Sequence, residues 1–164
     1  MNELTILDCT LRDGGYYNSW DFDRTLIEDY LKAMKDASVD YVELGLRSFN
    51  KQGYRGPCAY TTDNFIRSLN IPEGVKVGVM VNASELINFP GGPDKAISKL
   101  FTSKSESPVS LVRIACHAHE FEVALPVSNW LKDNGYTVGF NLMQIAERTN
   151  EEIVNLIRKT KSYP

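Results

Sequence analysis

An arginine and an aspartate stand side by side at Arg12 and Asp13, shortly after the first apolar run of the chain, residues 4–7. A carboxylate oxygen is a hard ligand that suits Mg²⁺, Mn²⁺ or Zn²⁺. A guanidinium can hold a carboxylate or a developing enolate oxygen with paired donors. Gly14 and Gly15 follow, and glycine lets the backbone turn sharply and approach a ligand closely. The pattern indicates a metal and anion site, although a bare Asp-Gly pair is more often a simple turn.

Short apolar runs alternate with helical patterns along the whole chain. The runs cover residues 4–7, 41–45, 75–81, 110–116 and 137–143. Helical spacing is found over residues 23–37, 63–69, 94–101, 121–133 and 151–161. Asp21 or Asp23 is expected to cap the first of these helices, and Asn150 or Thr149 the last.

Strand followed by helix, five times over, implies an α/β fold with a parallel sheet and right-handed crossovers. An open doubly wound sheet and a (β/α)₈ barrel both satisfy this pattern. A complete barrel needs about 250 residues, and the chain has 164. We therefore expect parallel (β/α) units of a TIM barrel, incomplete at about five of eight units. An open sheet of flavodoxin type ranks last, because no phosphate loop follows the first run.

Composition excludes several classes of protein. Hydrophobic residues make up 43% and charged residues 24% of the chain, with a formal net charge of -3, as in an ordinary soluble domain. No basic stripe predicts a nucleic-acid partner, and no apolar run approaches the roughly 18 residues that cross a bilayer. The 3 cysteines fit poorly with a disulfide framework. A cytoplasmic location is expected.

Residues 8–15, Asp-Cys-Thr-Leu-Arg-Asp-Gly-Gly, resemble the opening of the DRE-TIM metallolyase (HMGL-like) superfamily of TIM barrels. That superfamily includes hydroxymethylglutaryl-CoA lyase, isopropylmalate and homocitrate synthases, and 4-hydroxy-2-oxovalerate aldolase. Its hallmark joins an Arg-Asp pair on strand one to a Glu on strand two, and residues 42–45 supply Glu43 at the expected place. The order of elements matches over essentially the whole chain. Residues 112–115 and 138–140 look most like the 4-hydroxy-2-oxovalerate aldolase branch.

The resemblance implies a role for each matching residue. Asp13 would bind a divalent metal, Mn²⁺ or Mg²⁺ with Zn²⁺ as an alternative, and Arg12 would stabilise an enolate. Glu43 would hold Arg12 in place or support the site. A structural salt bridge without chemistry is an equal alternative for Glu43. His117, Asn82 and Asn141, near the ends of later strands, are candidates to line the substrate, although either asparagine could cap the next element.

The chain departs from the family pattern in two places. The family completes its metal shell with a His-x-His pair on strand seven, so the shell would be incomplete in residues 1–164. His117 and His119 have the same spacing, but they follow the fourth run and are not expected to be those ligands. His119 is expected in a loop or at a helix start. Tyr16 stands where the aldolase branch has an acid-base His. Its hydroxyl could donate a proton or a hydrogen bond, or its ring could serve as a lid.

Two functions therefore remain open for the chain. In the first, residues 1–164 are the N-terminal portion of a metal-dependent aldolase or lyase. It would cleave or form a C–C bond in a 2-oxo or 3-hydroxy acid through an enolate, and the isolated chain would be inactive. In the second, the domain is a non-catalytic barrel that binds a small acid and has lost the acid-base residue. In both, exposed strand edges favour a homo-oligomer or self-association.

Overall fold

The computed structural model describes residues 4–163. The chain divides into two compact units. Unit 1 contains the residues up to Met80 together with Ser107–Leu111, and unit 2 contains Val81–Glu106 and the residues from Val112 onwards. Five strands form one sheet in the order β1-β2-β3-β4-β5, so each strand lies beside its neighbours in the sequence. The expected class, parallel (β/α) units of an incomplete barrel, is confirmed.

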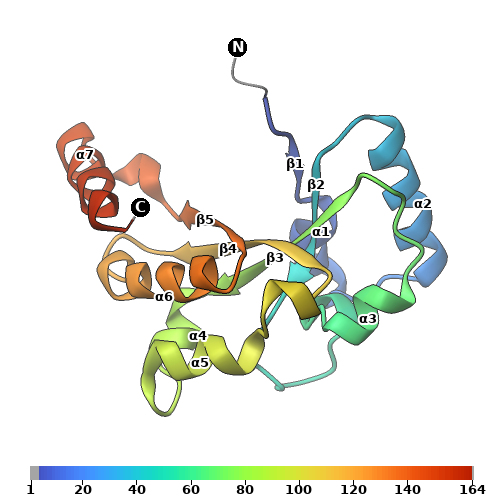
Figure 1. Cartoon of the computed structure of the whole chain (residues 1–164), viewed down its shortest axis with the longest axis horizontal. Helices are drawn as coiled ribbons and strands as arrows, with labels where there is room; N and C mark the ends of the chain where they lie inside the picture. The colour runs from blue at the N-terminus through green and yellow to red at the C-terminus, as the bar shows by residue number, and fades with distance from the viewer. Residues whose placement is uncertain (1–3, 164) are drawn as a thin grey trace. The chain divides into compact units, whose positions relative to one another are not determined.

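Unit 1 begins with a very short strand and two helices. Its elements are β1 (Leu7–Asp8), α1 (Thr10–Asn18), α2 (Arg24–Asp36), β2 (Tyr41–Leu46), the 3₁₀ turn η1 (Pro57–Ala59), α3 (Asp63–Ser68) and most of β3 (Lys76–Asn82). Figure 1 shows α1 beginning where β1 ends, and α2 returning beside the strands. Both strand pairs of this unit are parallel, with Asp8 opposite Val42 and Val42 opposite Val77.

The local sequence explains where the long helix of unit 1 begins and which face it buries. The Asp23 side chain accepts a hydrogen bond from the Thr25 backbone N–H at 2.8 Å, so Asp23 and not Asp21 is the N-cap of α2. Ile27 and Leu31, one turn apart, are fully buried, which gives α2 an apolar face toward the core.

Helix α1 corrects one expectation, because Gly14 and Gly15 lie inside it and form no turn. The role of Gly15 is a close approach to another side chain. A Cβ atom at position 15 would fall 2.0 Å from Cδ1 of Trp20, so any larger residue would displace the indole ring. Trp20 itself is buried and has a left-handed backbone with φ 57°. The charged pair therefore sits on a helix that continues from β1.

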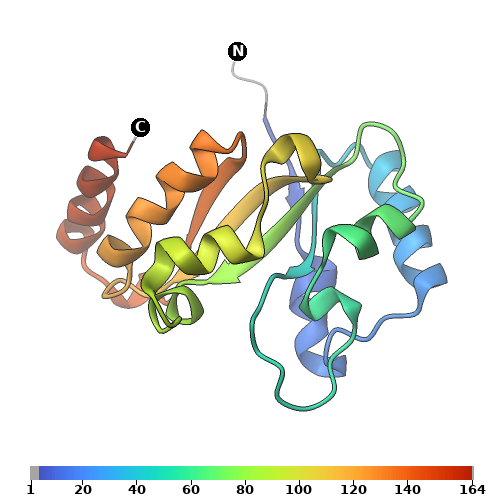
Figure 2. The ribbon, with the colours of Figure 1, turned by 60° about the horizontal axis from the view of Figure 1, so that its bottom comes forward.

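Unit 2 holds the remaining helices. Its elements are α4 (Ala83–Ile87), α5 (Gly92–Leu100), η2 (Lys104–Glu106), most of β4 (Val109–Cys116), α6 (Phe121–Asp133), β5 (Thr137–Leu142), η3 (Ile145–Glu147), α7 (Asn150–Lys159) and η4 (Thr160–Ser162). Helices α4, α5 and α6 pack against one another (Figures 1 and 2). The short helix α4 was not expected from the sequence.

The last helix starts as its sequence predicts. The Thr149 hydroxyl accepts from the Glu152 backbone N–H, and the Glu152 carboxylate accepts from the Thr149 N–H, which together form a capping box. Leu156 is the buried residue of α7, whereas Val154 and Ile157 are exposed. In the described part of the chain, no helix is both long and apolar enough to cross a membrane.

Candidate functional site

The centre of unit 1 is an ion pair between α1 and β2. Nε of Arg12 donates to Oε2 of Glu43 at 2.8 Å. The Glu43 side chain is 0% exposed and that of Arg12 is 11% exposed. Because β1 pairs with β2 in parallel register, the first turn of α1 is brought beside this part of β2. The two residues that the sequence analysis connected are thus in direct contact.

Asp13 extends the pair toward solvent. Its Oδ1 accepts from an Arg12 guanidinium nitrogen, while the Asp13 side chain is 62% exposed. Burial by itself would lower the pKa of Arg12. The hydrogen bond and charge of Glu43, with the charge of Asp13 and a contact with Cys9, instead raise that pKa above its ordinary value. Arg12 therefore stays cationic, with one carboxylate buried behind it and one exposed beside it.

An irregularity in β2 lies next to Glu43. Glu43 is opposite Gly78 and Gly45 is opposite Val79, so β2 advances by two residues where β3 advances by one. Such bulges redirect side chains and often occur next to functional sites. Position 45 has to be a glycine for a steric reason, because a Cβ there would fall 1.9 Å from the Cys58 carbonyl oxygen. The bulge and the close loop together fix the backbone that carries Glu43.

A second polar cluster supports the start of α1, and the sequence analysis did not anticipate it. The Asp8 carboxylate accepts from the Thr10 backbone N–H at 2.8 Å and from the Tyr30 hydroxyl. Burial favours a higher pKa for Asp8, but these hydrogen bonds outweigh it and hold the pKa below its ordinary value. Burial and the Asp8 contact raise the pKa of Tyr30. Asp8 is therefore an anion that anchors the turn leading into Arg12.

Arg47 is a further buried charged residue, and nothing in the sequence singled it out. It follows the last residue of β2 and is 5% exposed. Its guanidinium donates to the Thr61 carbonyl at 3.1 Å and to the Asp63 carboxylate. Ser107 also donates to Asp63, at 3.0 Å. The only signal in the sequence was an arginine directly after a buried strand, which a surface charge would match equally well.

Tyr16 lies on α1, one turn beyond Arg12, and is 62% exposed. Its ring meets Trp20 edge to face, with centroids 4.7 Å apart. Nε1 of Trp20 donates to the Arg12 carbonyl oxygen at 3.0 Å. The structure thus places Tyr16 on the same helix as Arg12 and Asp13, with its ring in contact with an aromatic neighbour.

The other candidate residues belong to unit 2. Asn82 is the N-cap position of α4 without a side-chain capping bond, and its Nδ2 lies 3.4 Å from a Glu85 oxygen. Asn141 is half-buried on β5. Asn82 thus occupies the expected N-cap position, although its side chain makes no capping hydrogen bond. The N-cap of the element after β5 is Gln144 and not Asn141.

His117 and His119 lie in the turn between β4 and α6. The Glu120 side chain accepts from the His117 backbone N–H at 2.8 Å. The two imidazole rings stack with centroids 5.6 Å apart and planes 8° apart. Imidazole nitrogens bind a metal in the plane of the ring, and two parallel planes share no such point. Within residues 4–163, no group of three or more His, Cys, Asp or Glu side chains is arranged to hold a metal ion, so Asp13 is a single candidate ligand.

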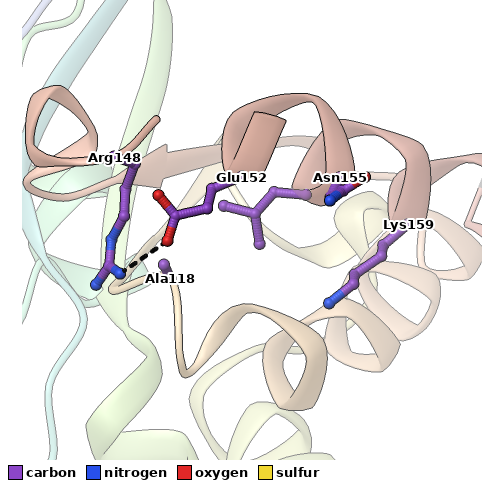
Figure 3. Close-up of a pocket in the computed structure, with 6 residues that line it drawn as sticks. Ala118, Arg148, Glu152, Asn155 and Lys159 are labelled. Atoms are coloured by element: carbon purple, nitrogen blue, oxygen red, sulfur yellow. Dashed lines mark hydrogen bonds and ion pairs between the residues drawn. The ribbon is translucent and has the colours of Figure 1, made fainter. Parts of the chain in front are cut away.

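Unit 2 also contains an open hollow of about 190 Å³ beside α7. It is lined by Ala118, Arg148, Glu152, Asn155, Leu156 and Lys159. Figure 3 shows the side chains of Arg148 and Lys159 at opposite ends of this hollow, with Glu152 facing Arg148. Both cations are already paired, Arg148 with Glu152 at 3.5 Å and Lys159 with Glu122. Nothing in the sequence indicated this hollow, because most of its residues follow the ordinary helical spacing of a solvated face.

Comparison with known proteins places the fold among aldolase-like domains of consecutive parallel (β/α) units. The chain is similar to a crystal structure described as "the N-terminal domain of a putative aldolase from Bacteroides vulgatus". The two share 28% sequence identity and superpose with a TM-score of 0.71 over 97% of this chain. The chain spans 60% of the length of that protein. No protein-family model and no curated protein matches the sequence.

Proposed function

We propose that this chain carries the enolate-stabilising part of a metal-dependent aldolase, a carbon–carbon lyase acting on a 2-oxo or 3-hydroxy acid. The observation that supports it is the arrangement of Glu43, Arg12 and Asp13, from buried carboxylate to exposed carboxylate. The similarity to an aldolase domain at 28% identity supports the aldolase class.

The proposed chemistry assigns a task to each residue. In cleavage of a 4-hydroxy-2-oxo acid, the C3–C4 bond breaks and its electron pair moves into the enolate of the 2-oxo acid. The C4 hydroxyl gives its proton to solvent and becomes the carbonyl of an aldehyde, and C3 of the enolate takes up a proton from solvent to give the free 2-oxo acid. A divalent metal, Mn²⁺ or Mg²⁺, would polarise the 2-oxo group when bound. Asp13 would hold that metal, and the Arg12 guanidinium would stabilise the enolate oxygen.

Glu43 would act as a positioning residue in this arrangement. Its buried carboxylate accepts a hydrogen bond from Nε of Arg12. This bond fixes the orientation of the Arg12 guanidinium and therefore the direction of its two terminal nitrogens. A fixed guanidinium loses less side-chain entropy when an anion binds. Tyr16 would donate a hydrogen bond to the C4 oxygen, which stays on C4 and takes on carbonyl character as the C3–C4 bond breaks.

Binding of oxalate, a stable analogue of the pyruvate enolate, tests the proposal. Calorimetric titration with Mn²⁺ in the presence of oxalate should give a measurable affinity that falls at least tenfold in Asp13→Ala. Asp29→Ala is the matched control, because Asp29 is an equally exposed carboxylate at 65% on α2. Wild-type Mn²⁺ affinity in Asp13→Ala would remove Asp13 from the metal site and with it the proposal.

A non-catalytic domain that binds a small acid is the second candidate function. The presence of Tyr16, where the resembling aldolases carry an acid-base His, favours it. Release of pyruvate from 4-hydroxy-2-oxopentanoate by the full-length protein, in the presence of Mn²⁺, separates the two. Measurable cleavage would dismiss the binding domain, whereas oxalate binding without any cleavage would support it.

A further inference from the structure

Helix α1 repeats its charged pair as an aromatic pair one turn later. Tyr16 is four residues after Arg12, and Tyr17 is four residues after Asp13. Residues four apart lie on the same face of a helix. Tyr16 therefore follows Arg12, and Tyr17 follows Asp13, along the surface of α1, with Arg12 bonded to the buried Glu43 and Asp13 exposed to solvent. We call the two tyrosine rings the aromatic wall (Tyr16 and Tyr17).

The aromatic wall is open to solvent. Tyr17 is 95% exposed and Tyr16 is 62% exposed. Helix α1 continues from the carboxyl end of β1, as Figure 2 shows. Since a helix rises about 1.5 Å per residue, the wall stands about 6 Å farther along α1 than the charged pair.

Contacts within unit 1 hold one side of the wall in place. The Tyr16 ring packs on Trp20, whose indole N–H is bonded to the Arg12 carbonyl. Trp20 makes a second contact with Arg55, whose guanidinium carbon lies over the Trp20 ring, 5.4 Å from its centroid. Trp20 is in turn seated against Gly15. Because Tyr16 leans on a buried ring tied to Arg12 itself, the distance between the wall and the guanidinium is defined by the fold.

From this arrangement we propose that the aromatic wall selects 2-oxo acids whose C4 carries a planar aromatic group. The inference rests on the proposed function, because it takes the 2-oxo carboxylate end to lie at Arg12 and Asp13. With that end in place, the C4 substituent lies a few bond lengths farther along α1, beside the two rings. A phenyl group can stack on them or meet them edge to face, whereas a methyl group covers little of either ring.

Two non-cleavable ligands test this inference on the complete chain. 2-Oxo-4-phenylbutanoate and 2-oxopentanoate share the 2-oxo acid and differ in phenyl against methyl at C4. The chain has 2 tryptophans, so a Trp130→Phe background leaves Trp20 fluorescence as the reporter of binding, with Mg²⁺ present. The phenyl ligand should bind at least fivefold more tightly.

Variants of the wall separate ring contact from hydroxyl chemistry. Tyr16→Ala and Tyr17→Ala should each shrink the phenyl preference, and Tyr16→Phe should keep it because the ring remains. Tyr54→Ala is the control, since Tyr54 is an exposed tyrosine outside α1, and it should leave the preference unchanged. Arg12→Lys, which keeps a cation beside the buried Glu43 carboxylate but loses the paired guanidinium donors, should weaken both ligands equally.

The outcomes distinguish the wall from the underlying site. Equal affinity for both ligands, each dependent on Arg12, would overturn the aromatic wall and leave the proposed function standing. Binding of neither ligand would overturn the proposed function itself. A preference for phenyl that survives both alanine variants would also overturn the wall, because the ring contact would then lie elsewhere.

Discussion

Glu43 is a carboxylate with no exposed surface, and its charge requires a cation at hydrogen-bond distance. Arg12 supplies that cation from a different element, 31 residues earlier in the chain. Burying a lone carboxylate is so costly that it normally takes up a proton instead. The Arg12–Glu43 contact is therefore a condition for folding of unit 1, whatever its part in the proposed reaction.

Removing one partner of this ion pair should cost more than removing both. Arg12→Met should destabilise the fold by about 3 to 5 kcal/mol, since it leaves the buried Glu43 carboxylate without its cation. The double variant Arg12→Met/Glu43→Leu should recover more than half of that loss. Urea unfolding followed by far-UV circular dichroism measures both. Equal losses in the single and double variants would show that charge burial plays no part.

The Asp8 cluster gives the chain a defined pH response. The folded state lowers the pKa of Asp8 through hydrogen bonds from Tyr30 and Thr10, although burial opposes them. A depressed pKa adds stability above the unfolded value of about 3.9, and this stability is lost as the pH falls through the folded pKa. Tyr30→Phe should therefore cost about 1 kcal/mol at pH 7, with the difference from wild type shrinking below about pH 4. Urea unfolding at pH 7 and pH 3 measures it, and a pH-independent difference would contradict the assignment.

At this scale, the residues that the sequence pattern singled out are in contact in the folded chain. The Arg12-Asp13 pair and Glu43 stand out because charged residues interrupt or directly follow apolar strands. Asp8, Tyr30 and Arg47 could not be found in that way. Their partners lie on other elements, and only the folded chain shows that Tyr30, on the buried side of α2, reaches Asp8.

At the scale of single elements, the bulge in β2 leaves no room for a side chain at Gly45. A Cβ there would lie 1.9 Å from a backbone carbonyl oxygen, whereas a Cβ at Gly78 on β3 would meet its nearest atom at 3.5 Å. Gly45→Ala should therefore destabilise the protein by about 3 kcal/mol, and Gly78→Ala should change its stability by less than about 1 kcal/mol. Thermal unfolding of the two variants checks this, and similar losses would mean that the loop after β2 can move aside.

Element boundaries were predicted well where caps and periodicity agree. Helix α6 covers the predicted residues 121–133, and the cap of α7 is Thr149, one of the two residues that the sequence offered. Helix α1 was missed because two glycines and two tyrosines are poor helix formers. Tertiary contacts override that preference, since Trp20 packs on Gly15 and bonds to the Arg12 carbonyl.

At the scale of the whole molecule, β5 is a terminal strand of the described sheet. A strand edge with free backbone groups can pair with another chain, so we expect the polypeptide to self-associate with rising concentration. Val138→Lys, at a half-buried position of β5, should reduce the association measured by light scattering. Val123→Lys, at an exposed position of helix α6, is the control. A single monomeric species at all concentrations would contradict the expectation.

The order of strands in the sheet, which follows their order in the sequence, has a consequence for biosynthesis. Every strand after β1 can pair with the strand that was made before it. None of these strands has to wait for a segment that is made later in translation. The nascent polypeptide can thus extend its sheet one strand at a time during translation. The Arg12–Glu43 contact can form once β2 has left the exit tunnel.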